Sequence, residues 1–283
     1  MSADSNLQSE DRFLCSICLD VFTDPVTTSC GHNFCKKCIT QYWDVHERCQ
    51  CPLCKETFNS RPQLKINTFI SEMVAQAVET LRKDMKKLFE AELKRVQQYA
   101  VDVTLDPDTA NPDLILSDDG KQVKYGDVKK KLPDNPERFS QCVCVLGEQS
   151  FSSGRFYFEV QVKGKTKWSL GVATESISRK GKIRLSPQNG LWTVCLRNGN
   201  KYKACAVSLQ SGPEKVGVFV DYEEGLVSFY DVDAAALIYS FTGCSFTQKL
   251  HPYLNPCNND DGKNAAPLLI TPINLILCED RLD

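Results

Sequence analysis

Seven cysteines and one histidine lie close together near the start of the chain, at spacings that suit metal binding. They form four short pairs: Cys15 with Cys18, Cys30 with His32, Cys35 with Cys38, and Cys51 with Cys54. Thiolate sulfur and imidazole nitrogen are ligands that Zn²⁺ prefers, and four of them complete a tetrahedral site. Eight such side chains therefore supply the ligands for two zinc ions and leave no open coordination position for a substrate. The sequence predicts two Zn²⁺ ions with a structural role.

The other cysteines do not share this spacing. Cys49 competes with Cys51 on position alone, but the Cys-Pro-Leu-Cys pattern of residues 51–54 favours Cys51 as the ligand. The chain has 15 cysteines, an odd number, and the seven beyond residue 54 are scattered. We expect these seven to be reduced and partly buried rather than paired in disulfides.

Composition limits the class of protein. The 283 residues are 42% hydrophobic and 25% charged, and this length predicts two domains. No apolar run approaches the about 18 residues of a membrane span, and the polar start is no signal peptide, so we expect a cytoplasmic protein without membrane contact. The formal net charge is −2 and no region is strongly basic, which argues against nucleic acid as a partner.

One helix is predicted over residues 66–100, which contain no Gly and no Pro. Apolar residues recur there at alternating spacings of three and four, as in a coiled-coil seam: Ile70, Val74, Val78, Leu81, Met85 and Leu88. The seam lasts only about two to three heptads, short for an independent coiled coil. Two interpretations stay open: the helix packs on its own zinc module, or it forms a weak homodimer.

Residues 101–283 change to short alternating apolar runs separated by turn residues. Asn198-Gly199 and Glu224-Gly225 suit hairpin turns between such runs. The strands are expected at 155–162, 168–174, 191–197, 216–220, 226–230, 237–241 and 268–277. The predicted fold is therefore multidomain and mainly β: an N-terminal zinc module, one helical linker, and a C-terminal antiparallel β-sandwich.

The order of the metal ligands, the Gly31-His32 step and the Cys-Pro-Leu-Cys ending resemble the RING finger of ubiquitin ligases, here over residues 11–58. This resemblance implies a cross-brace, in which the two metal sites interleave along the chain. Cys15, Cys18, Cys35 and Cys38 would hold the first zinc, and Cys30, His32, Cys51 and Cys54 the second.

The same resemblance implies the activity. A RING has no nucleophile; it holds a ubiquitin-loaded conjugating enzyme in the reactive arrangement, so it acts by orientation. The family's apolar contact positions are filled by Ile17, Trp43, Pro52 and Leu53, and its basic donor position by Lys55. From the residues alone, Ile17 and Trp43 could equally form the core of the module, and Lys55 could be a surface charge.

Residues 101–283 resemble the PRY-SPRY domain that ends many tripartite-motif ubiquitin ligases. The matching stretches are 105–110, 116–120, 154–160, 168–172, 217–223 and 228–230. Phe158 departs from the family, which usually has Trp there. PRY-SPRY domains bind partner proteins, and the positions of the pocket in an antibody-binding member correspond to Ser169, Cys195, Arg197 and Asn258. Since three aromatic anchors are missing, we expect an unknown protein substrate other than an antibody.

The usual middle of this family is reduced here. Residues 55–141 contain no Cys and no His, so they hold no ligand for a B-box zinc finger. The resemblance is thus to a shortened family member with little coiled coil. We predict a cytoplasmic RING-type ubiquitin-protein ligase, active in innate immunity, whose PRY-SPRY domain recruits the substrate. The alternative is a non-enzymatic PRY-SPRY binding protein or decoy.

Overall fold

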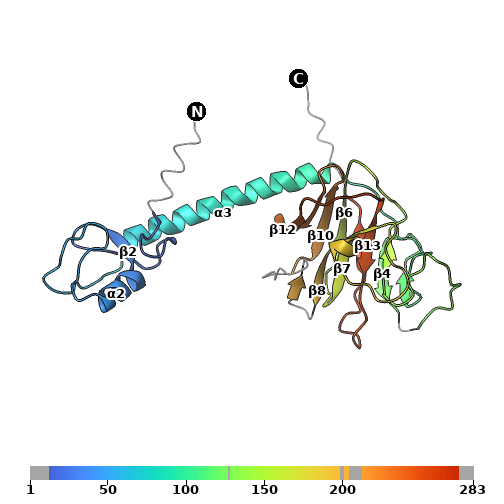
Figure 1. Ribbon diagram of the computed structural model, residues 1–283, viewed down its shortest axis with the longest axis horizontal. Helices are drawn as coiled ribbons and strands as arrows, with labels where there is room; N and C mark the ends of the chain where they lie inside the picture. Colours follow the sequence, from blue (N-terminus) through green and yellow to red (C-terminus); the bar gives the residue numbers. More distant parts are fainter. Residues whose placement is uncertain (1–12, 127, 198–200, 204–211, 274–283) are drawn as a thin grey trace, which may run out of the picture. The chain divides into compact units, whose positions relative to one another are not determined.

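The computed structural model describes residues 13–126, 128–197, 201–203 and 212–273 (Figure 1). The chain divides into two compact units, Met1–Met85 and Lys86–Asp283. Among the described helices, none combines the length and the apolar character needed to cross a bilayer.

The first unit is a small zinc module built on a hairpin and a helix. Strands β1 (Pro25–Thr27) and β2 (Asn33–Cys35) pair antiparallel, and helix α2 (Lys36–Val45) follows directly. The buried apolar side chains of this module are few: Phe22, Val26, Phe34, Ile39, Trp43 and Val74. So small a core supports the module only together with the metal ligands, three of which are buried within it.

Helix α3 (Thr68–Gln97) begins at a side-chain cap. The Oδ1 atom of Asn67 accepts the backbone N–H of Ile70 at 3.1 Å, which satisfies a free donor in the first turn. The first part of the apolar seam, Ile70, Val74 and Val78, packs on the core of the zinc module, as one of the two interpretations expected. The later part is exposed to solvent: Leu81 by 46%, Met85 by 55% and Leu88 by 71%.

The second unit is a sandwich of two antiparallel sheets (Figure 1). The seven-stranded sheet has the order β12 (Ala236–Phe241), β11 (Leu226–Asp231), β10 (Lys215–Asp221), β6 (Arg155–Gln161), β14 (Leu268–Thr271), β4 (Gln122–Tyr125) and β3 (Leu114–Leu116). The five-stranded sheet has the order β5 (Val145–Leu146), β13 (Leu250–Asn255), β7 (Trp168–Thr174), β8 (Leu191–Arg197) and β9 (Lys201–Lys203).

The main core lies between the two sheets. Phe158 and Val218 from the larger sheet join Leu170, Val194 and Leu254 from the smaller one in a single buried cluster. Side chains alternate along each strand, so the neighbours of these residues point to the outer face. The predicted mainly β fold with an antiparallel sandwich is confirmed.

The outer face of the larger sheet is covered by the end of α3. Leu93 and Val96 of the helix pack on Tyr157, Phe219 and Tyr230 of the sheet. A buried carboxylate fixes this contact because the Oε1 atom of Glu159, which is 3% exposed, accepts hydrogen bonds from Tyr157 at 3.0 Å and from Gln97 at 2.9 Å. The last turns of α3 therefore belong to the sandwich.

Several elements differ from the sequence-based expectation. Strands β3, β4, β5, β9 and β13 lie outside the ranges expected from the sequence, and β13 contains Pro252, which lacks the N–H that a central strand normally donates. The structure nevertheless keeps Pro252 opposite Val172 of β7. Gly225 adopts the expected positive φ of 61° between β10 and β11. The predicted Asn198-Gly199 turn and the end of the predicted last strand, 274–277, lie outside the described residues.

We expect Leu93→Ala to lower the unfolding free energy of the sandwich by about 2 to 5 kcal/mol, because it leaves a cavity under the helix. The control is Leu88→Ala in the same helix, whose side chain is 71% exposed and should change stability by less than about 0.5 kcal/mol. Urea unfolding can be followed by fluorescence in a Trp43→Phe background, where Trp168 and Trp192 of the sandwich report. Equal effects of the two substitutions would contradict the packing of α3 on the sheet.

Candidate functional site

Two clusters of soft ligands lie in the zinc module. The ligand atoms of the first cluster, Cys15, Cys18, Cys35 and Cys38, all lie within 4.8 Å of one another. The same holds for Cys30, His32, Cys51 and Cys54 in the second cluster. These are the two sets that the RING resemblance implied, and they interleave along the chain. Sulfur and imidazole without a carboxylate suit Zn²⁺, so the module has the ligands for two structural zinc ions.

One Cys-x-x-Cys pair of each cluster lies on a tight turn, and the two turns have the same backbone hydrogen bond and the same left-handed residue. The backbone N–H of Leu19 donates to the carbonyl of Cys15 at 2.7 Å, and that of Lys55 donates to the carbonyl of Cys51 at 3.0 Å. Both Leu19 and Lys55 have a φ of 63°, in the left-handed region. This tight turn brings the two thiols of each Cys-x-x-Cys pair to one point. It also fixes Lys55 directly beside the second cluster.

The thiols of one cluster cannot all ionise without a cation. In the first cluster burial opposes ionisation of Cys15, but backbone N–H groups, led by that of Cys35, outweigh it and lower its pKa to about 7. Burial, the Cys18 thiol and nearby negative charge raise the pKa of Cys38 to about 12. Zn²⁺ removes this conflict because it stabilises every thiolate at once. Binding therefore releases protons, and affinity falls as the pH is lowered.

The second cluster shows the same split. Burial opposes ionisation of Cys30, but hydrogen bonds from Thr28 and His32 lower its pKa to about 6. Burial raises the pKa of Cys51. The Thr28 hydroxyl lies 3.0 Å from the Cys30 sulfur. Polar groups around the ligands thus favour thiolates that are already oriented for a metal.

The predicted contact residues for a conjugating enzyme lie around these turns. Ile17 and Pro52 are half-buried, and Leu53 is 50% exposed although its side chain is apolar. Lys55 is exposed as well. Trp43 is different: it is 3% exposed, and its Nε1–H donates to the carbonyl of Gln50 at 2.9 Å. Trp43 therefore lies in the module's core, as the alternative interpretation expected.

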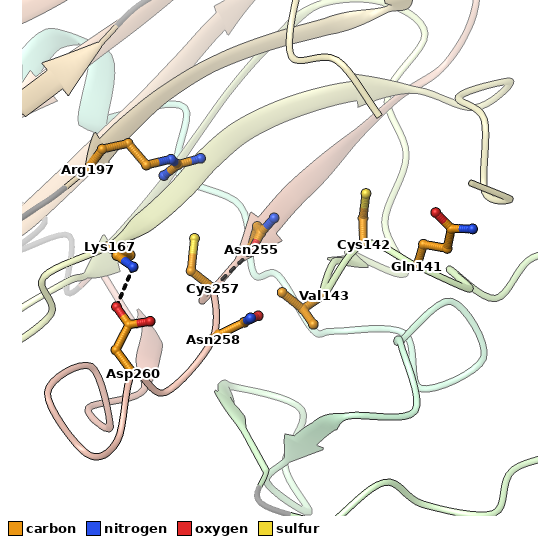
Figure 2. A pocket seen from close by; sticks show the side chains of 9 residues that line it. All are labelled: Gln141, Cys142, Val143, Lys167, Arg197, Asn255, Cys257, Asn258 and Asp260. Atoms are coloured by element: carbon orange, nitrogen blue, oxygen red, sulfur yellow. Dashed lines mark hydrogen bonds and ion pairs between the residues drawn. The ribbon is translucent and has the colours of Figure 1, made fainter. Parts of the chain in front are cut away.

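The predicted substrate-recognition residues lie in the five-stranded sheet and just beyond its strand β13. Ser169 of β7 and Cys195 of β8 face each other across paired strands. Arg197, at the end of β8, donates from Nη2 to the Oγ of Ser169 at 2.7 Å, and Ser169 is fully buried. Arg197 and Asn258 line a pocket of about 410 Å³ (Figure 2). Ser169 supports the pocket through Arg197.

Sequence reasoning missed other residues of this pocket. Cys142, Lys167, Cys257 and Asp260 also line it, and Lys167 forms an ion pair with Asp260 (Figure 2). They come from separate segments that only the folded sandwich brings together, and they belong to no short motif. The available signal was proximity in the sequence: Cys257 and Asp260 lie close to Asn258, and Lys167 lies two residues before Ser169.

Metal analysis of the purified chain should return about two zinc ions per chain. Cys51→Ser should lower this content because it removes a ligand of the second cluster. The matched control is Cys49→Ser, which should keep both metals because Cys49 belongs to neither cluster. A loss of zinc in Cys49→Ser with full retention in Cys51→Ser would overturn the ligand assignment.

Comparisons with known proteins find relatives of both the zinc module and the sandwich. A RING-type zinc-finger model matches residues 15–50, an SPRY-associated domain model matches 103–151, and an SPRY domain model matches 155–268. The structure titled "Crystal structure of TRIM65 PSpry domain" matches at a TM-score of 0.53 with 23% identity, over 64% of this chain and 94% of that one. At this identity the likeness shows the fold alone.

Curated relatives share more of the sequence. "Nuclear factor 7, ovary" of Xenopus laevis is 49% identical over 208 residues, which cover 71% of this chain and 34% of that protein. "E3 ubiquitin-protein ligase TRIM21" of Bos taurus is 44% identical over 186 residues, covering 64% of this chain and 40% of that protein. The chain thus matches about a third to two fifths of the length of these relatives. With a RING-type zinc finger followed by PRY and SPRY segments, and with such relatives, the chain belongs to the tripartite-motif (RING/PRY-SPRY) family.

Proposed function

We propose that the chain is a RING-type ubiquitin-protein ligase. In this proposal residues 11–58 position a ubiquitin-loaded conjugating enzyme, residues 66–100 form the helical linker, and residues 101–283 recruit the protein substrate. The observation that carries it is the pair of four-ligand Cys/His clusters, each with a turn that presents an apolar side chain beside the metal ligands. The family's "E3 ubiquitin-protein ligase" relatives support the same activity.

The chemistry follows from the closed metal sites. Each cluster has four ligands, so a bound zinc would offer no open position to activate water or a carbonyl group. Ubiquitin would pass directly from the conjugating enzyme to the substrate, and this chain would contribute orientation. No ubiquitin would be bound covalently to the chain itself.

The proposal places the contact surface for the enzyme in an apolar groove formed by the two turns. Ile17 directly precedes Cys18 and Leu53 directly precedes Cys54, so the two side chains hold equivalent places. Pro52 stiffens the second turn, and Trp43 supports the groove from the core. Lys55 is exposed, and its backbone is fixed by the hydrogen bond to Cys51. In this proposal its ammonium group would contact the bound enzyme–ubiquitin pair.

The proposal also covers location and biological role. Reduced metal thiolates suit the cytoplasm, where disulfides are rare. A role in innate immunity rests on the family resemblance. The substrate would bind at the end of the sandwich where Arg197 and Asn258 line the pocket.

Association of two copies is the last part of the proposal. Leu81, Met85 and Leu88 are exposed apolar residues that continue the seam of α3. A stripe of this length supports only weak association. Pairing would bring two RING modules together and raise the activity.

We expect Ile17→Ala to slow ubiquitin transfer about tenfold or more while both zinc ions stay bound, since it removes apolar contact area and no ligand. An in-vitro autoubiquitination assay with a panel of conjugating enzymes, together with metal analysis, measures this. The control is Ile66→Ala, another partly exposed isoleucine of the same unit, which lies outside the two turns and should keep the wild-type rate. Wild-type transfer by Ile17→Ala would show that the groove assignment is wrong.

Light scattering over a concentration series should show a monomer that forms dimers with a dissociation constant of about tens of micromolar to millimolar. Leu81→Asp combined with Leu88→Asp should suppress the dimer and lower activity, because charge on the stripe opposes burial. Arg82→Asp, on the same helix but off the seam, is the control. A nanomolar dimer would contradict the weak-association model.

If chains fused to a dimeric scaffold transfer no ubiquitin with any enzyme, the binding-protein or decoy alternative replaces the ligase.

A further inference from the structure

The pocket on the sandwich is surrounded by more positive than negative charge. Lys165, Lys167 and Arg197 all lie near Cys257: burial raises the pKa of this thiol, while the three positive charges lower it. Lys167 is neutralised by its ion pair with Asp260. The other two cations face no carboxylate within salt-bridge distance among the described residues.

Lys165 shows how unusual this charge is. Lys165 is 7% exposed. Among the described residues, its Nζ donates only to neutral carbonyls, those of Asn264 at 3.2 Å and Ala266 at 2.8 Å. Burial without a carboxylate lowers its pKa to about 8. A buried cation of this kind adds to the positive potential of the pocket and is stabilised by a nearby anion.

Arg197 has guanidinium N–H groups that are available to a ligand. Its Nη1 donates to the carbonyls of Trp168 at 2.6 Å and Leu196 at 2.7 Å, and its Nη2 donates to Ser169 at 2.7 Å. A guanidinium has five N–H donors, so Nε–H and one N–H of Nη2 remain without a partner among the described residues. The residues that follow it and are not described, 198–200 and 204–211, contain no Asp or Glu.

We propose that this pocket binds a carboxylate side chain from an acidic segment of the partner protein, with Arg197 as the ligand that receives it. The inference rests on the proposed role of the sandwich in substrate recruitment. Three hydrogen bonds fix the orientation of the planar guanidinium. A carboxylate is also planar and can accept two parallel N–H groups from it. Among the described residues that line the pocket, Arg197 is the only cation without an ion pair, because Lys167 is paired with Asp260, so a singly charged group fits better than a phosphate. The neutral amides of Gln141 and Asn258 complete the wall.

The wall that carries Asn258 is held in place before binding. Asn264 is 1% exposed, and its Oδ1 accepts the backbone N–H groups of Thr166 at 2.9 Å and Lys167 at 3.1 Å. Its Nδ2 donates to the carbonyls of Pro256 and Asn258, each at 2.9 Å. A pocket fixed in this way loses little conformational freedom when a ligand binds.

The test is selection of a phage-displayed library of random peptides on the immobilised full-length zinc-bound chain. Peptides selected by the wild type should be enriched in Asp or Glu at one position. They should bind about tenfold or more weakly to Arg197→Gln, because a hydrogen-bonded charge is lost. Since Arg197→Gln also removes bonds within the sheet, the second variant is Asn258→Asp. It keeps Arg197 and supplies a competing carboxylate, so it should weaken the same peptides.

The control variant is Lys163→Gln, which removes an exposed cation that is paired with Glu214 outside the pocket. It should bind the selected peptides as the wild type does. A selected peptide is then compared with versions that carry Gln or phosphoserine at the acidic position, and the Gln version should bind about tenfold more weakly.

Three results would overturn the proposal. These are peptides without an acidic preference, peptides that bind Asn258→Asp as well as the wild type, or a phosphoserine version that binds more tightly than the carboxylate. Peptide selection does not depend on ubiquitin transfer, so an inactive RING leaves this test unaffected. Conversely, active transfer without acidic selection would reject the carboxylate and keep the ligase.

Discussion

The mutual repulsion of crowded thiolates is the constraint on which the zinc module depends. Four ligand atoms lie within 4.8 Å in each cluster; burial and the neighbouring thiols raise the pKa of Cys38 to about 12, whereas backbone N–H groups outweigh burial at Cys15 and lower its pKa to about 7. A divalent cation removes that repulsion and links distant parts of the chain, so metal binding becomes folding energy. The two turns that present Ile17, Leu53 and Lys55 are held by the same ligands. The proposed enzyme groove therefore exists only where the metal sites form.

The sandwich depends on a different principle, the burial of both faces of one sheet. Phe158 and Val218 point into the space between the sheets, whereas Tyr157 and Phe219 point outward under the end of α3. An outer face of this kind needs a cover, and the helix supplies one. The buried carboxylate of Glu159 is stabilised there because the side chains of Tyr157 and Gln97 donate hydrogen bonds to it. The Nζ of Lys215 also lies 3.3 Å from its Oε2. The helical linker thus contributes to stability as well as to connection.

The two units support complementary parts of the proposed activity. The zinc module offers small apolar and basic groups on rigid turns, which suit orientation of another enzyme. The sandwich offers a pocket in which Arg197 is immobilised on strand ends and Asn258 on a loop fixed by Asn264. Rigid placement of a few polar groups is what gives a recognition site its specificity.

The sequence by itself determined the metal chemistry, half of the described strands and the long helix, because these follow from local spacing: two residues between paired cysteines, a period of two in strands, and a period near 3.6 in the helix. Tertiary structure alone decided the rest. It placed Pro252 within a sheet despite its missing N–H, and it buried Trp43 rather than exposing it. It also gathered Lys167, Arg197 and Asp260 from separate segments around one pocket. Contacts between residues far apart in the chain depend on packing and charge in three dimensions, which no local pattern records.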